Sequence, residues 1–115
     1  MINLLKKEPI KAFIQKLLDE NSYFYNMSVI FVDNKKFNEK YFFKFVNWID
    51  KSLKNGGVFG ISYDTDLTQN DIEMFLNNLV YYLEMDMVKK QKSILDDEDK
   101  KIAKKGIQKL LKESK

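Results

Sequence analysis

The chain has 115 residues, of which 44% are hydrophobic and 14% aromatic, which is enough apolar material for a folded core and excludes a mainly disordered chain. Its 20 basic and 17 acidic residues give a net charge of +3, and no apolar run approaches the roughly 20 residues that a membrane-spanning helix needs. The first residues lack the apolar length and the cleavage site of a signal peptide, and no cysteine is present, so we expect a soluble, cytoplasmic protein.

The first predicted elements are a helix and a strand. Pro9 suits the first turn of a helix, and apolar residues then recur with helical period through Leu18, so this helix is expected to end near Asp19. Residues 28–32 are aromatic or β-branched except for one serine, which predicts a strand that ends at Asp33.

The next predicted helix begins after Asn38, a suitable N-cap. Phe37 and Phe42 occupy the two positions of a hydrophobic staple, and Gly56-Gly57 predicts a glycine C-cap. On a helical wheel the large apolar side chains fill an arc of about 160°, whereas an ordinary surface helix needs roughly 100°. We therefore expect this helix to be covered on more than one side, with Trp48 at the edge of the arc.

Residues 58–63 predict a second short strand, and Asp64-Thr65-Asp66 predicts a turn. Thr68 and Asp71 then fit the capping box of a third helix. Its predicted core face holds Ile72, Phe75, Leu76, Leu79, Tyr82 and Leu83. Because Asp86 would fall within that face, the helix is expected to end near Met85.

The segment 87–95 fits either a continuation of the helix or a third strand. Acidic residues at 96–99 favour the start of a last helix, which is expected to run to about Leu111. The prediction is an α+β fold in a small single domain over 1–115, with about four helices and a two- or three-stranded sheet. If the two strands pair directly, the helix between them makes a parallel, right-handed crossover.

The chain offers little for catalysis. It has no histidine and no cysteine, so it lacks the commonest general base and the preferred ligands of zinc and copper. Asp64 and Asp66 could form a metal-binding pair, but we interpret them as turn residues. No phosphate-loop motif follows the glycines, and Gly60 indicates a bulge or a close backbone approach. We predict no catalytic residue, metal or cofactor, and no enzymatic activity; an acid–base enzyme that uses carboxylates alone is the remaining alternative.

Positive charge is concentrated at the end of the chain. Residues 1–87 hold ten lysines and twelve acidic residues, whereas the basic C-terminal segment, 88–115, holds ten lysines and five acidic residues, for a net charge of +5. All basic residues are lysines, which contact phosphates as point charges and lack the bidentate base recognition of arginine. Eight lysines are predicted to contact nucleic-acid phosphates: Lys89, Lys90, Lys92, Lys101, Lys104, Lys105, Lys109 and Lys112.

The last predicted helix is amphipathic, with apolar residues on one half of its wheel and lysines on the other. Such a helix suits nucleic-acid phosphates, an anionic membrane or an acidic groove in a partner protein. Membrane binding is the weakest of these interpretations, because the apolar half is small and has no aromatic residue. An ordinary docked helix with a solvated lysine face explains the same pattern.

A second surface is predicted on the third helix, where Met74, Tyr81 and Met85 lie roughly opposite the core face. Adaptable methionines beside an aromatic residue indicate a protein interface, with a partner or with a second copy. The alternative is that the last helix covers these three side chains.

The stretch 72–112 resembles the second half of a winged-helix DNA-binding domain. In that fold a helix ends in Leu-x-x-x-x-Val, as at Leu83 and Val88, a charged hairpin follows, and Lys-Gly opens the last helix, as at Lys105-Gly106. The resemblance covers about a third of the chain and implies, by analogy of fold, a winged-helix-like protein that binds DNA.

Together these observations favour a small nucleic-acid-associated accessory or regulatory protein, expected to be dimeric, that binds DNA through lysine–phosphate contacts. The alternative is a non-enzymatic protein-interaction module, such as an inhibitor, immunity or adaptor protein, with an acidic protein partner. No membrane partner is expected.

Overall fold

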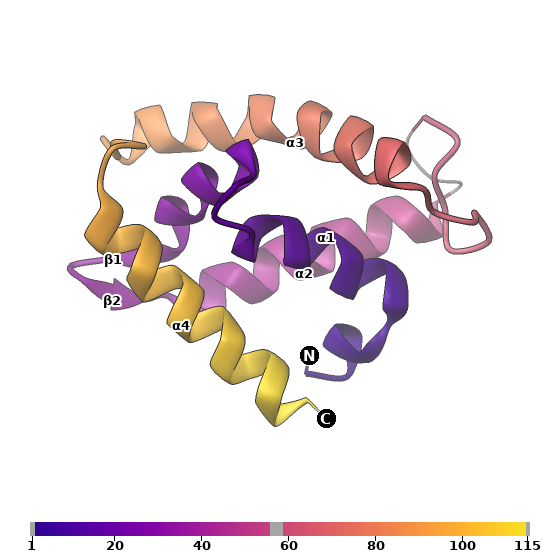
Figure 1. Ribbon diagram of the computed structural model, residues 1–115, viewed down its shortest axis with the longest axis horizontal. Helices are drawn as coiled ribbons and strands as arrows, with labels where there is room; N and C mark the ends of the chain where they lie inside the picture. The colour runs from indigo at the N-terminus through magenta and orange to yellow at the C-terminus, as the bar shows by residue number, and fades with distance from the viewer. Residues whose placement is uncertain (1, 56–58, 115) are drawn as a thin grey trace.

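The computed structural model describes residues 2–55 and 59–114. Helices dominate it, and a two-stranded antiparallel sheet makes it broadly α+β (Figure 1). Among the helices of the described ranges, none combines the length and the hydrophobicity that crossing a membrane requires. The elements in chain order are η1 (Ile2–Lys6), α1 (Glu8–Leu18), η2 (Tyr23–Phe31), β1 (Val32–Asp33), β2 (Lys36–Phe37), α2 (Glu39–Lys54), α3 (Gln69–Lys89) and α4 (Asp97–Glu113).

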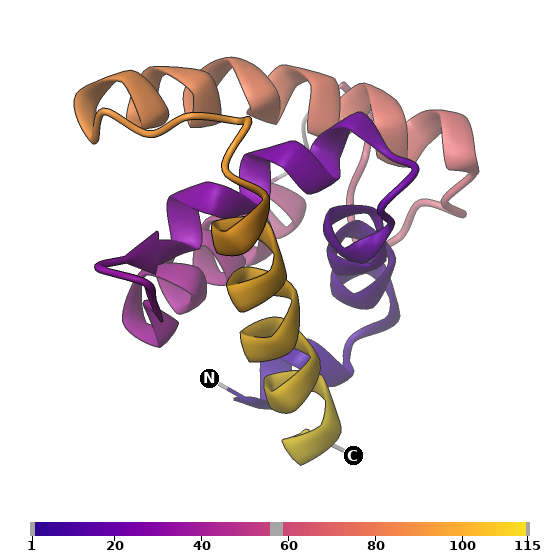
Figure 2. The same ribbon diagram turned by 60° about the vertical axis from the view of Figure 1, so that its left-hand side comes forward.

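The centre of the molecule is η2, a 3-10 helix that packs against all four α-helices. Figure 2 shows it between α3 above and α4 below. The predicted strand at 28–32 is therefore wrong for all but Val32. The side chains of residues 27–32 are buried throughout, so their sequence is apolar without periodicity, and such a short run does not distinguish a buried helix from a buried strand.

The sheet is a short hairpin in which Val32 pairs with Phe37 and Asp33 with Lys36. Asn34 and Lys35 connect the strands with φ angles of 50° and 60°, the left-handed geometry that two-residue hairpins use. The predicted parallel crossover is thus wrong, because β2 precedes α2. A strand at 59–63 is wrong as well: those residues form turns and one isolated bridge at Ile61, and position 58 lies outside the described residues.

The predicted start of α2 is confirmed. The Asn38 side chain accepts a hydrogen bond from the Tyr41 backbone N–H at 2.9 Å, and the Phe37 and Phe42 rings lie 5.8 Å apart as the staple requires. The predicted glycine C-cap falls at 56–57, outside the described residues. Helix α2 buries one broad face, and Trp48 lies at its edge as expected.

Helix α3 begins as predicted, with the reciprocal capping box of Thr68 and Asp71. Its predicted end near Met85 is wrong, because the helix continues to Lys89. The Asp86 carboxylate lies at the edge of the packed face, where it accepts a hydrogen bond from the Tyr41 hydroxyl. The acidic residue is therefore paired, and the helix does not have to end before it.

Helix α4 starts at the predicted acidic cluster, where the Asp96 side chain caps the backbone N–H of Asp99. It packs against η2, α1, η1 and the hairpin. Gly106 lets the Phe37 ring approach closely, since a Cβ built at Gly106 would lie 2.3 Å from that ring. The close backbone approach predicted as one role of Gly60 is wrong, since nothing lies within 4 Å of a Cβ built there. Its φ of +78° is the feature that favours glycine.

Candidate functional site

A groove lies between α2 and α3, and most of the side chains that line it are apolar. It has a volume of about 400 Å³, within the size range of ligand-binding clefts. We call it the α2–α3 groove. Its walls are Tyr41, Lys44, Phe45 and Trp48 of α2 with Leu79, Tyr82, Leu83 and Asp86 of α3.

Trp48 and Tyr82 form the outer walls of the groove, with 40% and 56% of their surfaces exposed and ring centroids 6.2 Å apart. Trp48 also packs against the buried Phe75 ring at 6.4 Å, which fixes the indole from below. The sequence-based placement of Tyr82 in the core is wrong. Its position on the wheel lies at the border of the buried arc, and the packing leaves the ring open to the groove.

One end of the groove is polar. The Tyr41 hydroxyl donates to Asp86, and the Lys90 ammonium lies 3.4 Å from the same carboxylate and 3.3 Å from the centroid of the Tyr41 ring. Burial raises the pKa of Tyr41 well above its usual value, and the hydrogen bond to Asp86 raises it further. The charge of Asp86 is thus matched within the protein. Lys44 is exposed and forms no ion pair within the described part of the chain.

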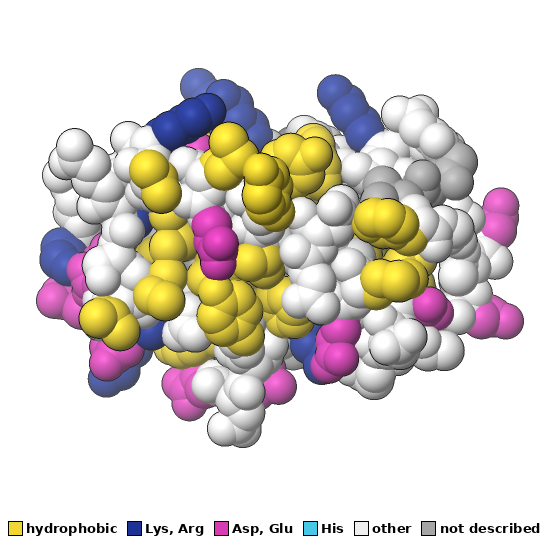
Figure 3. Space-filling model, turned by 90° about the horizontal axis from the view of Figure 1, so that it is seen from above, with side chains coloured by type: hydrophobic (Ala, Val, Ile, Leu, Met, Phe, Trp, Pro, Cys, Tyr) yellow, Lys and Arg dark blue, Asp and Glu magenta, His cyan; other side chains and the backbone are white. Residues whose placement is uncertain are grey.

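The outer face of α3 carries a second apolar surface, which we call the outer seam. Met74, Tyr81, Met85 and Val88 are 39%, 66%, 47% and 77% exposed, and Figure 3, which views the molecule from the α3 side, shows hydrophobic side chains gathered there. The structure thus places the three predicted residues on one open face and adds Val88. Helix α4 does not cover them, because it packs on the other side of η2.

Three of the eight lysines predicted to contact nucleic acid are held by the protein's own groups. Lys90 pairs with Asp86 at one end of the groove. Lys92 donates to the Val32 carbonyl and lies 3.8 Å from the Asp99 carboxylate. Lys104 pairs with Glu20 at 3.3 Å. The Lys90–Asp86 pair is local, four residues apart. The contacts of Lys92 with Val32 and of Lys104 with Glu20 join segments far apart in the sequence, so the charge pattern along the chain could not reveal those two.

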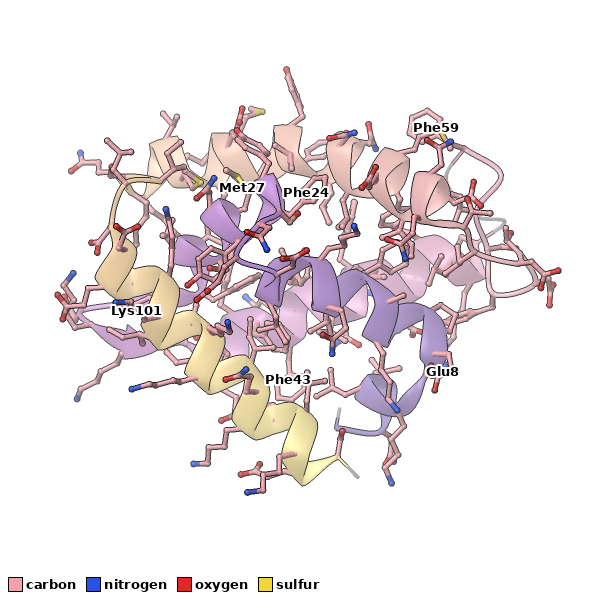
Figure 4. All side chains as sticks on the ribbon, viewed as in Figure 1. Glu8, Phe24, Met27, Phe43, Phe59 and Lys101 are labelled. Carbon is pink, nitrogen blue, oxygen red and sulfur yellow. The ribbon has the colours of Figure 1, made fainter. Side chains whose placement is uncertain are left out.

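The other five lysines are exposed, and within the described residues they form no ion pair. Lys89 lies on α3, apart from the others. The remaining four lie within about 80° of the wheel of α4, and we call them the lysine ridge: Lys101, Lys105, Lys109 and Lys112. Figure 4 labels Lys101, and it also labels Phe24 and Met27 of the buried η2.

The region around Asp64 and Asp66 is a turn, in which the Thr65 hydroxyl donates to the Gly60 carbonyl at 3.0 Å and accepts from the Ser62 backbone N–H at 2.9 Å. Both carboxylates are exposed. Within the described ranges, no group of three or more acidic side chains is arranged to hold a metal ion.

Sequence reasoning found the outer seam and the exposed edge of Trp48 but missed the groove between α2 and α3. The signal was weak, because the groove depends on how two helices that are distant in the chain meet in the fold, as at the Trp48 and Tyr82 rings. The polar end was equally hidden, since Tyr41 and Asp86 are 45 positions apart. Comparisons with protein families, with curated proteins and with solved structures find no match to this chain.

Proposed function

We propose that this protein is a non-enzymatic protein-interaction module that binds a partner protein through the α2–α3 groove. The observation that carries the proposal is the pair of exposed aromatic walls, Trp48 and Tyr82, over an apolar floor. Tryptophan and tyrosine are the residue types that most often contribute binding free energy at protein interfaces. They supply large contact areas while few rotatable bonds become ordered.

The groove also indicates the chemistry of the partner. Its volume of about 400 Å³ accommodates bulky apolar side chains, and its rim carries one cation, Lys44, whose charge no described carboxylate matches. A partner segment with an apolar anchor beside an acidic residue would fill the groove and pair with Lys44. The exposed Trp48 and Tyr82 rings extend the apolar surface beyond the floor of the groove, and such a surface is better suited to a protein than to a small molecule.

The test is affinity capture from a lysate of the source cells with tagged wild-type protein and with the variants Trp48→Ala and Tyr82→Ala. We expect one stoichiometric partner, and each variant should weaken its binding at least about tenfold because an interface anchor is lost. The matched control is Leu95→Ala, which removes an exposed apolar side chain from the loop outside the groove.

Circular dichroism would establish that the Trp48→Ala protein keeps its helices despite losing the contact with Phe75. The proposal fails if no partner is recovered in stoichiometric amount. It also fails if the folded groove variants retain the partner as well as the Leu95→Ala control does.

A second candidate function is nucleic-acid binding through α4, and the lysine ridge is the observation that favours it. The winged-helix likeness remains a prediction, and so does a cytoplasmic location. Four lysines on one side of a helix can contact successive phosphates without reading bases. Glu98 belongs to the same side of α4 near its start, where it lies 3.8 Å from Lys35, so phosphate contacts would begin at Lys101.

This second candidate is tested by the anisotropy of fluorescent duplex DNA at increasing salt. Each phosphate contact contributes about −0.9 to the slope of log K against log salt, so four contacts give roughly −3 to −4. Replacing Lys105 and Lys109 by glutamine should make the slope shallower by about 2. The control pair, Lys40→Gln and Lys51→Gln on α2, should change it little. Absence of binding by micromolar protein at low salt excludes this function.

A further inference from the structure

The outer seam of α3 follows the heptad spacing of a two-stranded coiled coil. Met74, Asn78, Tyr81, Met85 and Val88 are separated by four, three, four and three residues, which is the alternation of d and a positions. The buried residues of α3 fall on the opposite side of the same wheel. The helix therefore has two apolar faces, one that packs against the protein's own core and one that is open.

Asn78 lies between Met74 and Tyr81 of the outer seam and is the one amide in this heptad pattern. It is partly exposed and occupies an a position, and within the described residues its side chain has no hydrogen-bond partner. An asparagine at one a position sets the register and the two-stranded state of parallel coiled coils, because the two amides bind each other across the interface. Because the Asn78 amide lies among four apolar side chains, the side chain best able to bind it is another Asn78, from a second copy of the chain.

The charges that flank the seam fit a parallel pair. In the heptad numbering Glu84 is a g residue and Lys89 is the following e residue, and parallel helices bring a g residue beside the next e residue of the partner. The Tyr23 hydroxyl holds the Glu84 carboxylate at that edge of the helix with a 2.7 Å hydrogen bond. An antiparallel pair would instead place Asn78 opposite an apolar residue and leave Glu84 without Lys89.

We infer that the protein forms a parallel homodimer in which the outer seams of two α3 helices pack against each other. The two-fold axis runs along α3, and the two protein bodies lie on opposite sides of the paired helices. The dimer uses side chains other than the walls of the α2–α3 groove. It therefore goes beyond the proposed function, and the two can be tested independently.

Sedimentation equilibrium of the purified chain tests the association itself. The mass should rise from 13.7 kDa toward twice that value as the protein concentration increases. Met85→Glu should weaken the association at least about tenfold, because a charge would be buried at an a position, whereas Leu95→Glu should not. A mass of 13.7 kDa at every concentration overturns the inference.

The orientation can be read by disulfide trapping, since the wild-type chain has no cysteine. Asn78→Cys should form a covalent dimer rapidly on mild oxidation, because a parallel pair places the two 78 positions face to face, within the distance that a disulfide spans. Leu95→Cys, which is exposed but lies outside the seam, should react slowly. Equal rates for the two variants overturn the parallel arrangement.

Charge exchange supplies a second reading of the orientation. Glu84→Lys and Lys89→Glu should each weaken the dimer, and the double exchange should restore it; failure of the double variant to recover contradicts the proposed g–e pairing. A monomeric protein that still captures a partner through Trp48 and Tyr82 would retain the proposed function and overturn only the dimer. A dimeric protein that captures no partner would retain the dimer and overturn only the proposed function.

Discussion

Asp50 joins three separate segments of the chain through one buried carboxylate. Its oxygens accept a hydrogen bond from the Tyr63 hydroxyl and lie 3.4 Å from the Lys7 ammonium and 3.2 Å from that of Lys54. The Lys7 ammonium also lies 4.6 Å from the centroid of the Tyr63 ring. This small network therefore ties the residue before α1 and the loop before α3 to the C-terminal half of α2.

Replacing Asp50 by asparagine should lower the free energy of unfolding by about 1–3 kcal/mol, the usual effect of losing hydrogen bonds to a buried charged group. Urea unfolding at pH 7 measures the change. The control is Asp64→Asn, which removes an exposed carboxylate from the turn and should have little effect. Equal stabilities of the two variants would show that the network contributes nothing.

The same substitution should change how stability depends on pH. Burial alone would raise the pKa of Asp50, but the hydrogen bonds from Tyr63, Lys54 and Lys7 bring it below its usual value. The ionised carboxylate therefore contributes its full stabilisation above the ordinary aspartate pKa of about 3.9 and loses it as the pH falls through the lower, folded-state pKa. The stability difference between wild type and Asp50→Asn should accordingly shrink in acid, and a difference that stays constant there contradicts this account.

At the scale of the elements, the contact between α4 and the hairpin depends on Gly106. Alanine favours a helix by about 1 kcal/mol over glycine, yet a Cβ at Gly106 would overlap the Phe37 ring. We expect Gly106→Ala to destabilise the protein by about 1–3 kcal/mol, since overpacking exceeds the gain in helix propensity. Urea unfolding measures this change in the free energy of unfolding. The control is Gln108→Ala, on the exposed side of the same helix, which should be nearly neutral.

The double variant Phe37→Ala with Gly106→Ala separates the two causes. If the ring is the obstacle, the double variant should lose less stability than the sum of the single variants, because alanine at 37 makes room for the new methyl group. Additive losses would show that the Phe37 ring is not responsible.

The helices could be predicted where a capping side chain marks an end, as at Asn38, Thr68 and Asp96. The predictions failed where tertiary contacts decide the structure. Nothing local indicates that residues 23–31 form a 3-10 helix, because residues 27–31 are all buried and their sequence shows no period. The sequence predicts too early an end for α3, because the partner of Asp86, Tyr41, comes from another helix.

At the scale of the whole molecule, the apolar surface and the positive surface lie on different elements. The α2–α3 groove and the outer seam belong to α2 and α3, whereas the lysine ridge belongs to α4, on the other side of η2 (Figure 2). The tests of partner capture and of DNA binding are therefore independent: groove variants should leave the salt dependence of DNA binding unchanged.

The net charge of the basic C-terminal segment was a poor guide to free charge. Within it Lys90, Lys92 and Lys104 are bound to carboxylates, two of them on segments far earlier in the chain, so counting residues overestimates what a polyanion would meet. Helical spacing was a better guide. It predicts that Met74, Tyr81 and Met85 share one face of α3, because that face depends on one helix alone.

The position of η2 at the centre has a consequence for biosynthesis. Residues 23–31 leave the ribosome before α4, which covers one side of them, has been made. The growing chain must therefore carry an uncovered aromatic segment until residues 97–113 have emerged, and docking of this last helix completes the core. A nascent chain stalled before that point would present Phe24, Met27 and Phe31 to chaperones or to aggregation.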